Sequence, residues 1–174
     1  MIWYEKSESM QEDIKLNRVT LDSNVFISAV KENERYSKEC REILNNVGTS
    51  LILYQPTVSI TELYNGIGRT KGQAAAKQAL KDFYKMVYHL EDYGSKAQCE
   101  RVGKTALKYR IYSTDAFYLQ TSLDFKTKLI SLDEEEFIER IKQNDSRYRV
   151  YHVRDAFNAI NSQEKITIRD LIDP

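Results

Sequence analysis

Two kinds of hydrophobic pattern take turns along this chain. Short apolar runs, which are typical of buried strands, occupy residues 18–22, 50–54, 86–90, 128–132 and 147–153. Longer amphipathic stretches predict helices at residues 35–46, around Glu62, at 70–84 and 95–109, around Asp115, and at 134–142. Because short strands separated by helices favour parallel pairing, the pattern predicts an α/β fold with a parallel sheet.

Two of the predicted strands end on an acidic residue. Asp22 follows the apolar run Val19-Thr20-Leu21, and Asp133 follows the run at residues 128–132. In open α/β sheets, ligands bind outside the carboxyl ends of the strands, where successive connections leave in opposite directions. We therefore expect both aspartates at the functional site.

Two further acids lie on predicted helices. Glu62 belongs to a helix that begins after a proline and small hydroxyl residues and is expected to end near Gly66 and Gly68. Asp115 lies in the first turn of a helix for which Ser113 is the predicted N-cap. Helix positions of this kind can present both acids to the same site as the strand ends.

The four acids, Asp22, Glu62, Asp115 and Asp133, form a candidate metal site. Carboxylates that converge without cations repel one another, so such a group protonates, spreads apart or holds metal. No set of His or Cys ligands accompanies them, and oxygen ligands favour Mg²⁺ or Mn²⁺. Since such ions lower the pKa of bound water and bridge to phosphate oxygens, the residues indicate metal-assisted hydrolysis of a phosphodiester.

The order and surroundings of these acids resemble the PIN domain, a family of metal-dependent ribonucleases that includes the VapC-type toxins of prokaryotic toxin and antitoxin pairs. The resemblance rests on residues 19–26, 59–63, 113–117 and 129–133, which together span most of the chain. It implies a three-layer α/β/α sandwich with a central, mainly parallel sheet, in which the four acids bind Mg²⁺ or Mn²⁺. It also implies an RNA substrate, a small antitoxin protein as a partner, and commonly a homodimer.

The resemblance further implies supporting residues and domain boundaries. Asn24 and Ser113 are predicted to be polar supports near the acids. Residues 1–17 are expected to form an N-terminal extension, residues 18–160 the PIN-like nuclease domain, and residues 161–174 a C-terminal tail.

Other interpretations of these residues stay open. Each acid taken alone also fits a structural role: the strand-end aspartates as turn residues, Asp115 as a helix N-terminal charge, and Glu62 as a solvated side chain. Any of the glutamates at 134–136 could replace or assist Asp133 as a ligand, although the strand-end position favours Asp133. The alternative functions are a nuclease for RNA maturation or repair, and a PIN-like module that binds RNA or protein without cutting.

The distribution of charge along the chain limits the ways in which it could attract RNA. The 174 residues suit one globular domain, and 26 basic and 26 acidic residues give a formal net charge of zero, so no global field attracts RNA. Residues 69–110 carry ten Lys or Arg against four acids, whereas residues 133–145 carry six acids against two. The cations that could contact phosphates are Lys71, Lys77, Lys81, Lys85, Lys104, Lys108 and Arg110. Each of them is more often a solvated helix position.

The remaining signals mostly exclude functions. Cys40 and Cys99 lack a CxxC partner, which indicates neither a zinc site nor a disulfide framework and suits a reducing cytoplasm. No apolar run approaches the ~20 residues of a membrane span, so a cytoplasmic protein without membrane contact is expected. His89 and His152 are predicted to be packed or surface residues. Residues 166–169 alternate like a strand, which could pair with another edge or be an ordinary terminus.

Overall fold

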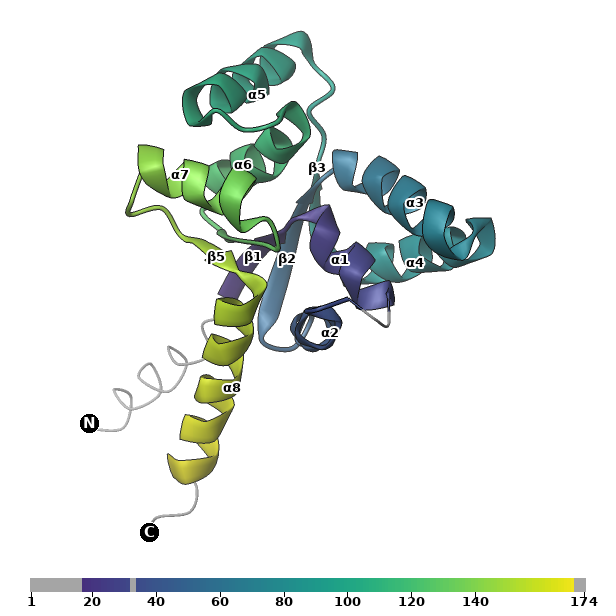
Figure 1. Cartoon of the computed structure of the whole chain (residues 1–174), viewed down its shortest axis with the longest axis vertical. Helices are drawn as coiled ribbons and strands as arrows, with labels where there is room; N and C mark the ends of the chain where they lie inside the picture. Colours follow the sequence, from purple (N-terminus) through teal and green to yellow (C-terminus); the bar gives the residue numbers. More distant parts are fainter. Residues whose placement is uncertain (1–16, 32–33, 171–174) are drawn as a thin grey trace, which may run out of the picture.

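A five-stranded parallel sheet forms the centre of the molecule (Figure 1). The computed structural model describes residues 17–31 and 34–170, with side chains described for 18–31 and 34–161. The strands are β1 (Asn17–Leu21), β2 (Leu51–Pro56), β3 (Val87–Glu91), β4 (Lys128–Ser131) and β5 (Val150–His152). They lie in the order β3-β2-β1-β4-β5 with every neighbouring pair parallel, which confirms the predicted parallel sheet.

Helices connect the strands and cover both faces of the sheet. They are α1 (Ser23–Val30), α2 (Ser37–Asn45), α3 (Val58–Lys71), α4 (Gln73–Met86), α5 (Lys96–Tyr109), α6 (Ser113–Phe125), the π-helical turn η1 (Glu134–Ile138), α7 (Glu139–Asn144) and α8 (Val153–Asp170). Helices α1 to α4 cover one face, and α5, α6 and α7 cover the other (Figure 1). The α/β/α sandwich expected from the sequence is therefore confirmed.

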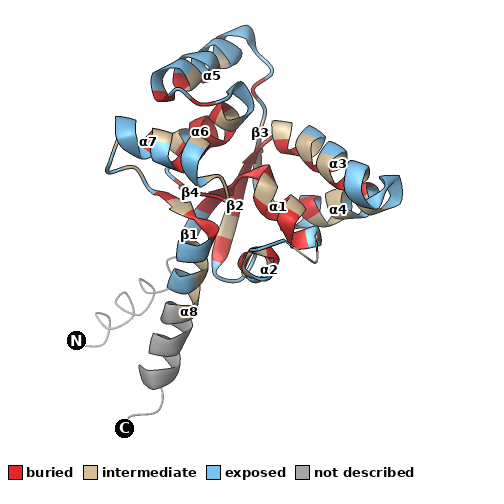
Figure 2. Cartoon of the chain, viewed as in Figure 1, coloured by how far each residue is buried: buried red, intermediate tan, exposed pale blue. Residues whose placement is uncertain are grey.

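Each face of the sheet packs into its own hydrophobic core (Figure 2). Leu21 and Phe83 belong to the core under α1 to α4, whereas Phe137 belongs to the core under α5 to α7. Leu129 and Ile130, neighbours in β4, enter different cores because successive side chains of a strand point to opposite faces. Burial on both faces explains why the strands appear in the sequence as unbroken apolar runs.

The helix that carries Glu62 is longer than predicted. Instead of ending near Gly66 and Gly68, α3 continues to Lys71 and ends at Gly72, whose φ is 88°. Gly66 has a packing role, because a Cβ atom there would lie 2.5 Å from Cδ1 of Ile27 in α1. The glycine therefore lets α3 approach α1 closely.

The two ends of the chain can be compared with the sequence-based expectations only in part. Residues 166–169, whose alternation left a strand or an ordinary terminus open, belong to α8, which continues as helix to Asp170. The expected boundary at residue 161 falls inside the same helix, and the N-terminal extension lies outside the described residues except for Asn17, which begins β1. In the described part of the chain, no helix combines the length and apolar character needed to cross a membrane.

Candidate active site

The connections of the sheet change direction between β1 and β4. From β1 the chain builds outward through β2 and β3, whereas β4 and β5 lie on the other side of β1. The carboxyl ends of β1 and β4 therefore form the topological switch point, where open α/β sheets bind ligands. Asp22 directly follows β1, and Asp133 lies two residues beyond the end of β4 at Ser131. Both strand-end acids lie where the sequence predicts them.

Asp22 is the buried centre of this region, with an exposure of 5%. Its Oδ2 accepts hydrogen bonds from the Ser131 hydroxyl at 2.6 Å and from the Asn24 side-chain amide at 2.7 Å. Its Oδ1 receives longer contacts, both at 3.5 Å, from the Ser23 hydroxyl and the backbone N–H of Asn24. One carboxylate oxygen is thus firmly held, and the other is held weakly.

Asn24 and Ser131 tie the ends of the two strands together. The Asn24 amide also donates to the Ser131 hydroxyl at 3.1 Å, and its carbonyl oxygen accepts from the backbone N–H of Leu132 at 3.1 Å. The Ser131 hydroxyl accepts from the backbone N–H of Asp133 at 3.0 Å. The supporting position predicted for Asn24 therefore rests on contacts to Asp22 and to the end of β4.

Glu62 and Tyr118 join helices from opposite faces of the sheet. The Tyr118 hydroxyl donates a hydrogen bond of 2.5 Å to Oε2 of Glu62, so α6 and α3 are linked at this point. Tyr118 is fully buried. Burial and the charge of Glu62 raise the pKa of Tyr118 well above its usual value, so its hydroxyl stays protonated and donates. Tyr118 was not predicted as a site residue.

Asp115 lies in the first turn of α6, as predicted, but Ser113 is not the N-cap. Tyr112 occupies the N-cap position without a side-chain hydrogen bond, and Ser113 is an exposed first residue of the helix. The serine that holds Asp22 closely is Ser131, at 2.6 Å, whereas the contact from Ser23 is 3.5 Å long. A serine before a helix is a local signal, whereas Ser131 acts across two strands.

Asp133 caps the π-helical turn that follows β4. Its Oδ1 accepts from the backbone N–H of Glu136 at 2.9 Å. Glu136 forms an ion pair with Arg140, and Glu134 approaches Arg154 at 4.0 Å. Because two of the three alternative glutamates face arginines elsewhere, the structure favours Asp133 over them as the acid associated with Asp22.

The four acids affect one another electrostatically. Burial, followed by the charges of Glu62 and Asp133, raises the pKa of Asp22 to about 6, against the lowering effect of its hydrogen bonds. Burial also raises the pKa of Asp115 to about 7, and the charges of Asp22, Asp133 and Glu62 add to this increase. Tertiary folding therefore brings all four predicted acids within electrostatic reach of each other.

No cation of the described chain neutralises this group. None of the ion pairs formed among residues 18–31 and 34–161 includes Asp22, Glu62, Asp115 or Asp133. Within the same residues, no three His, Cys, Asp or Glu side chains lie close enough together to enclose one metal ion. The carboxylate oxygens are of the type that hard divalent cations prefer.

Comparison with known proteins identifies the family. Residues 19–143 match the PIN domain, from within β1 to within α7. This chain belongs to the PIN domain family. The matched part includes all four acids as well as Asn24, Tyr118 and Ser131. No curated protein matches this sequence.

Solved structures share the fold of this PIN domain at low sequence identity. A protein from Pyrobaculum aerophilum superimposes with a TM-score of 0.60 at 16% identity, covering 86% of this chain and 98% of that chain. DNA-bound VapBC from Salmonella typhimurium gives a TM-score of 0.56 at 16% identity, over 79% and 98% of the two chains. VapC20 from Mycobacterium tuberculosis, a sarcin-ricin loop cleaving toxin, gives 0.56 at 10% identity, over 67% and 91%.

In the described part of the chain, the histidines and cations singled out in the sequence form no ion pair with the four acids of this PIN domain. His152 is buried and packs edge-on against Tyr36, and His89 hydrogen-bonds to Glu91 at 2.9 Å. Both histidines are therefore packed or paired residues, as predicted. The seven cations considered for phosphate contact are all exposed, namely Lys71, Lys77, Lys81, Lys85, Lys104, Lys108 and Arg110.

Proposed function

We propose that this PIN domain is an endoribonuclease that depends on Mg²⁺ or Mn²⁺ and hydrolyses RNA phosphodiester bonds. The observation that carries the proposal is the group of four acids at the switch point of the sheet, which is centred on a buried Asp22 and lacks a neutralising cation among the described residues. A purely structural role would favour ion pairs or exposure for such charges. A group of acids that stays together despite the mutual repulsion of its carboxylates is typical of a site that binds cations.

Asp22, Glu62, Asp115 and Asp133 are the residues that would hold the ion. Mg²⁺ keeps several waters and is usually bound through one or two carboxylates, so it would not require all four acids at once. A bound ion would lower the pKa of a water molecule and polarise the scissile phosphate. The weakly contacted Oδ1 of Asp22 is the oxygen that its hydrogen bonds leave available.

The neighbouring side chains orient these acids. Ser131 and Asn24 hold Oδ2 of Asp22, and Tyr118 holds Oε2 of Glu62, so each carboxylate has one anchored oxygen. Residues that hydrogen-bond to metal ligands fix their orientation before the ion arrives. One of the four carboxylates then accepts the proton that the attacking water loses.

Within the family, we propose a toxin of a toxin and antitoxin pair, with the nuclease unit at residues 18–160. Similarity to VapBC complexes supports this choice over an RNA-processing nuclease. A small antitoxin protein would then cover the acids, and a basic side chain inserted among them would compete with the metal ion. A homodimer and a cytoplasmic location belong to the same proposal. If expression of this protein arrests growth, and co-expression of the small protein encoded next to it restores growth, the protein is a toxin and not a processing enzyme.

The nuclease itself is tested with purified protein and a panel of single-stranded and structured RNAs, in Mn²⁺, Mg²⁺ or chelator. Asp22→Asn removes the central charge, and Asp92→Asn makes the same change at an exposed position as the control. Cleavage by the parent and by Asp92→Asn, only with metal, is the expected result. Cleavage by Asp22→Asn at the parental rate would refute the assignment of the site, and no cleavage by a folded, metal-binding parent would favour a non-catalytic module.

A further inference from the structure

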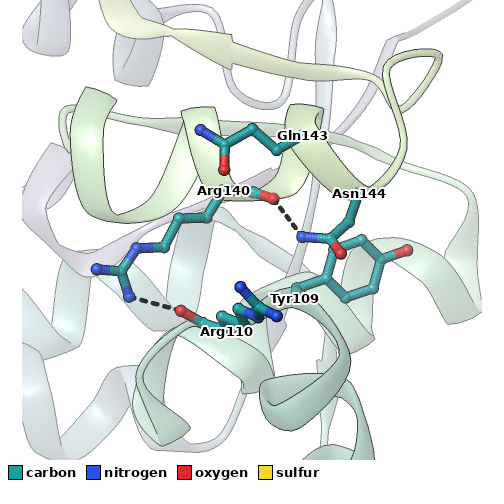
Figure 3. A pocket seen from close by; sticks show the side chains of 5 residues that line it. All are labelled: Tyr109, Arg110, Arg140, Gln143 and Asn144. Carbon is teal, nitrogen blue, oxygen red and sulfur yellow. Dashed lines mark hydrogen bonds between the residues drawn. The ribbon is translucent and has the colours of Figure 1, made fainter.

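A polar hollow of about 540 Å³ lies between the C-terminal end of α5 and α7 (Figure 3). It is lined by Tyr109, Arg110, Arg140, Gln143 and Asn144, and no acid is among these residues. Its volume falls within the range of about 300 to 1,000 Å³ that is typical of small-molecule sites. The lining offers two guanidinium groups and two amides, which suits an anionic ligand with hydrogen-bonding edges.

One wall of this Arg110 hollow is held in place by Arg140. The Arg140 guanidinium is paired with Glu136 and donates a hydrogen bond of 2.5 Å to the backbone carbonyl of Arg110. The Asn144 amide donates to the carbonyl of Arg140 at 2.9 Å. Figure 3 shows the hydrogen bond from Arg140 that joins α7 to the end of α5, and the bond from Asn144 within α7. Arg140 therefore has a structural role, and Glu136 already compensates its charge.

Arg110 supplies the cation that remains for a ligand. Its side chain is exposed and takes part in no ion pair among the described residues. Its φ of 55° places it in the left-handed region as the C-cap of α5, a position where glycine is usually preferred. Arginine thus occupies a position whose backbone conformation favours glycine.

Two short segments of the chain connect the hollow to residues of the acidic site. Arg110 is separated from the first residue of α6, the helix that presents Asp115, by Ile111 and Tyr112. Arg140 lies seven residues after Asp133, roughly 10 Å along the helical segment at 1.5 Å per residue. The four acids repel RNA phosphates and the chain has no net charge, so an RNA strand near them requires local cations.

We propose that the Arg110 hollow binds one unpaired nucleotide of the RNA substrate, with the phosphate at Arg110 and the base against Gln143 and Asn144. This inference rests on the proposed ribonuclease function. The Asn144 amide uses one of its two N–H groups on the Arg140 carbonyl, so one N–H and its oxygen remain for a base, and the Gln143 amide also offers both donors and an acceptor. Unpaired bases are commonly recognised through such edge contacts and by stacking on guanidinium planes.

The structure supplies a matched pair of variants for the test. Arg110 and Lys126 are both cationic C-caps in the left-handed region, with φ of 55° and 52°, on α5 and α6 respectively. Changing either residue to glycine removes one positive charge and relieves the same backbone strain, so neither variant should unfold the protein. Only Arg110→Gly removes a cation from the hollow.

RNA binding is measured by fluorescence anisotropy with a labelled single-stranded oligonucleotide of mixed sequence, in full-length protein that also carries Asp22→Asn. Arg110→Gly is expected to weaken binding roughly tenfold and to flatten the slope of log K against log salt by about 0.7. Lys126→Gly should leave both values near those of its parent. Equal losses in the two variants, no loss in Arg110→Gly, or no binding by the parent would overturn the proposal.

The base contact is tested with adenosine monophosphate and inorganic phosphate as separate probes, using NMR amide spectra. The nucleotide should shift the signals of Gln143 and Asn144, and Gln143→Ala should weaken nucleotide binding while leaving phosphate binding intact. Equal binding of both probes would overturn the assignment of the base. Binding and cleavage are separate measurements, so the two proposals can fail independently. If the parent cuts no RNA but Arg110→Gly alone weakens RNA binding, the nuclease is refuted and the hollow stands. If the parent cuts RNA but Arg110→Gly binds RNA as well as the parent, the hollow alone is refuted.

Discussion

The two strand ends that carry acids have similar sequences but different environments in the folded molecule. Asp22 after β1 and Asp133 after β4 each follow an apolar run, and each side chain caps the helix that begins next. Asp22 retains only 5% exposure and accepts hydrogen bonds from two other side chains at its Oδ2. Asp133 remains partly exposed. Its carboxylate accepts from the backbone N–H of Glu136, and its own backbone N–H donates to the Ser131 hydroxyl.

The difference arises from the position of each strand in the sheet. β1 is the middle strand, between β2 and β4, and the helices of both layers cover its end, whereas β4 is nearer the edge. Burial penalises a charged carboxylate and hydrogen bonds stabilise it, so the same residue type acquires different properties at the two positions. A local pattern can thus locate an acid, but the surrounding layers decide how strongly it is perturbed.

The largest expected effect compares the two acids directly. Asp22→Asn should lower the rate of RNA cleavage about a thousandfold, equivalent to several kcal/mol of lost transition-state stabilisation. Asp133→Asn should cause a smaller loss, on the order of a hundredfold, because Asp133 is less buried and has acidic neighbours. Single-turnover cleavage in saturating Mn²⁺ measures both rates. Equal losses would show that burial does not separate the two roles.

A second prediction concerns the hydroxyl that connects the two strand ends. Ser131→Ala removes the donor to Asp22 and the acceptor for the backbone N–H of Asp133, and should lower cleavage or metal affinity about 10- to 100-fold. Ser122→Ala is the matched control, because Ser122 is equally buried and its hydroxyl donates to the carbonyl of Thr127. Both variants should lose about 1 kcal/mol of stability. A comparable loss of activity in Ser122→Ala would indicate that only general stability was affected.

A third prediction follows from the raised pKa values of Asp22 and Asp115. Both pKa values rise from 3.8, to about 6 and about 7, so the folded metal-free protein binds more protons than the unfolded chain between these values. This contribution to stability is complete below about pH 4 and is lost as the pH rises through 6 and 7. Allowing for solvent screening at the partly exposed Asp115, the loss should be on the order of 2 kcal/mol.

Urea unfolding between pH 5 and pH 8, with chelator present, measures this loss. Asp115→Asn should flatten the dependence, and added Mg²⁺ should raise stability most at the higher pH, where the acids are ionised. Stability that rises with pH in the metal-free parent would contradict the assigned shifts.

The smallest expected effect concerns the packing of α1, which follows Asp22, against α3, which carries Glu62. Gly66→Ala would place a methyl group 2.5 Å from Cδ1 of Ile27, so the Ile27 side chain must move, at a net loss of about 1 kcal/mol. Gly68→Ala is the control in the same helix, because its added atom would meet Ala76 at 3.7 Å, and it should gain up to about 1 kcal/mol. Thermal unfolding measures both changes, and equal signs would exclude the close approach as the cause.

Much of the fold was predictable because its signals are local. Apolar runs located the strands, and the strand-end positions of Asp22 and Asp133 located the site once a parallel sheet was inferred. The helix α1 was missed because Val25, Phe26 and Ile27 form an unbroken apolar run, which lacks the spacing of an amphipathic helix. The alternation at residues 166–169 left its structure open, and these residues belong to α8, since a short alternation of apolar residues is also compatible with a helix.

The supporting residues were not predictable in this way. Ser131 lies 109 residues from Asp22, and Tyr118 lies 56 residues from Glu62, yet each pair is joined by a hydrogen bond. Ser113 was predicted to be the N-cap of α6 from its sequence neighbours alone, and its supporting role came from the family resemblance. Nothing in the local pattern distinguishes Ser131 from other buried serines until β4 is placed beside β1.

The sequence by itself determined the order of the strands and the four acids that follow or flank them, because periodicity and strand ends depend on nearby residues. Only the tertiary structure decided which acid is buried, which of its oxygens is anchored, and which arginine of the hollow remains without an ion pair among the described residues. Those properties depend on solvent exclusion and on hydrogen bonds between segments far apart in the chain, which exist only after the layers pack.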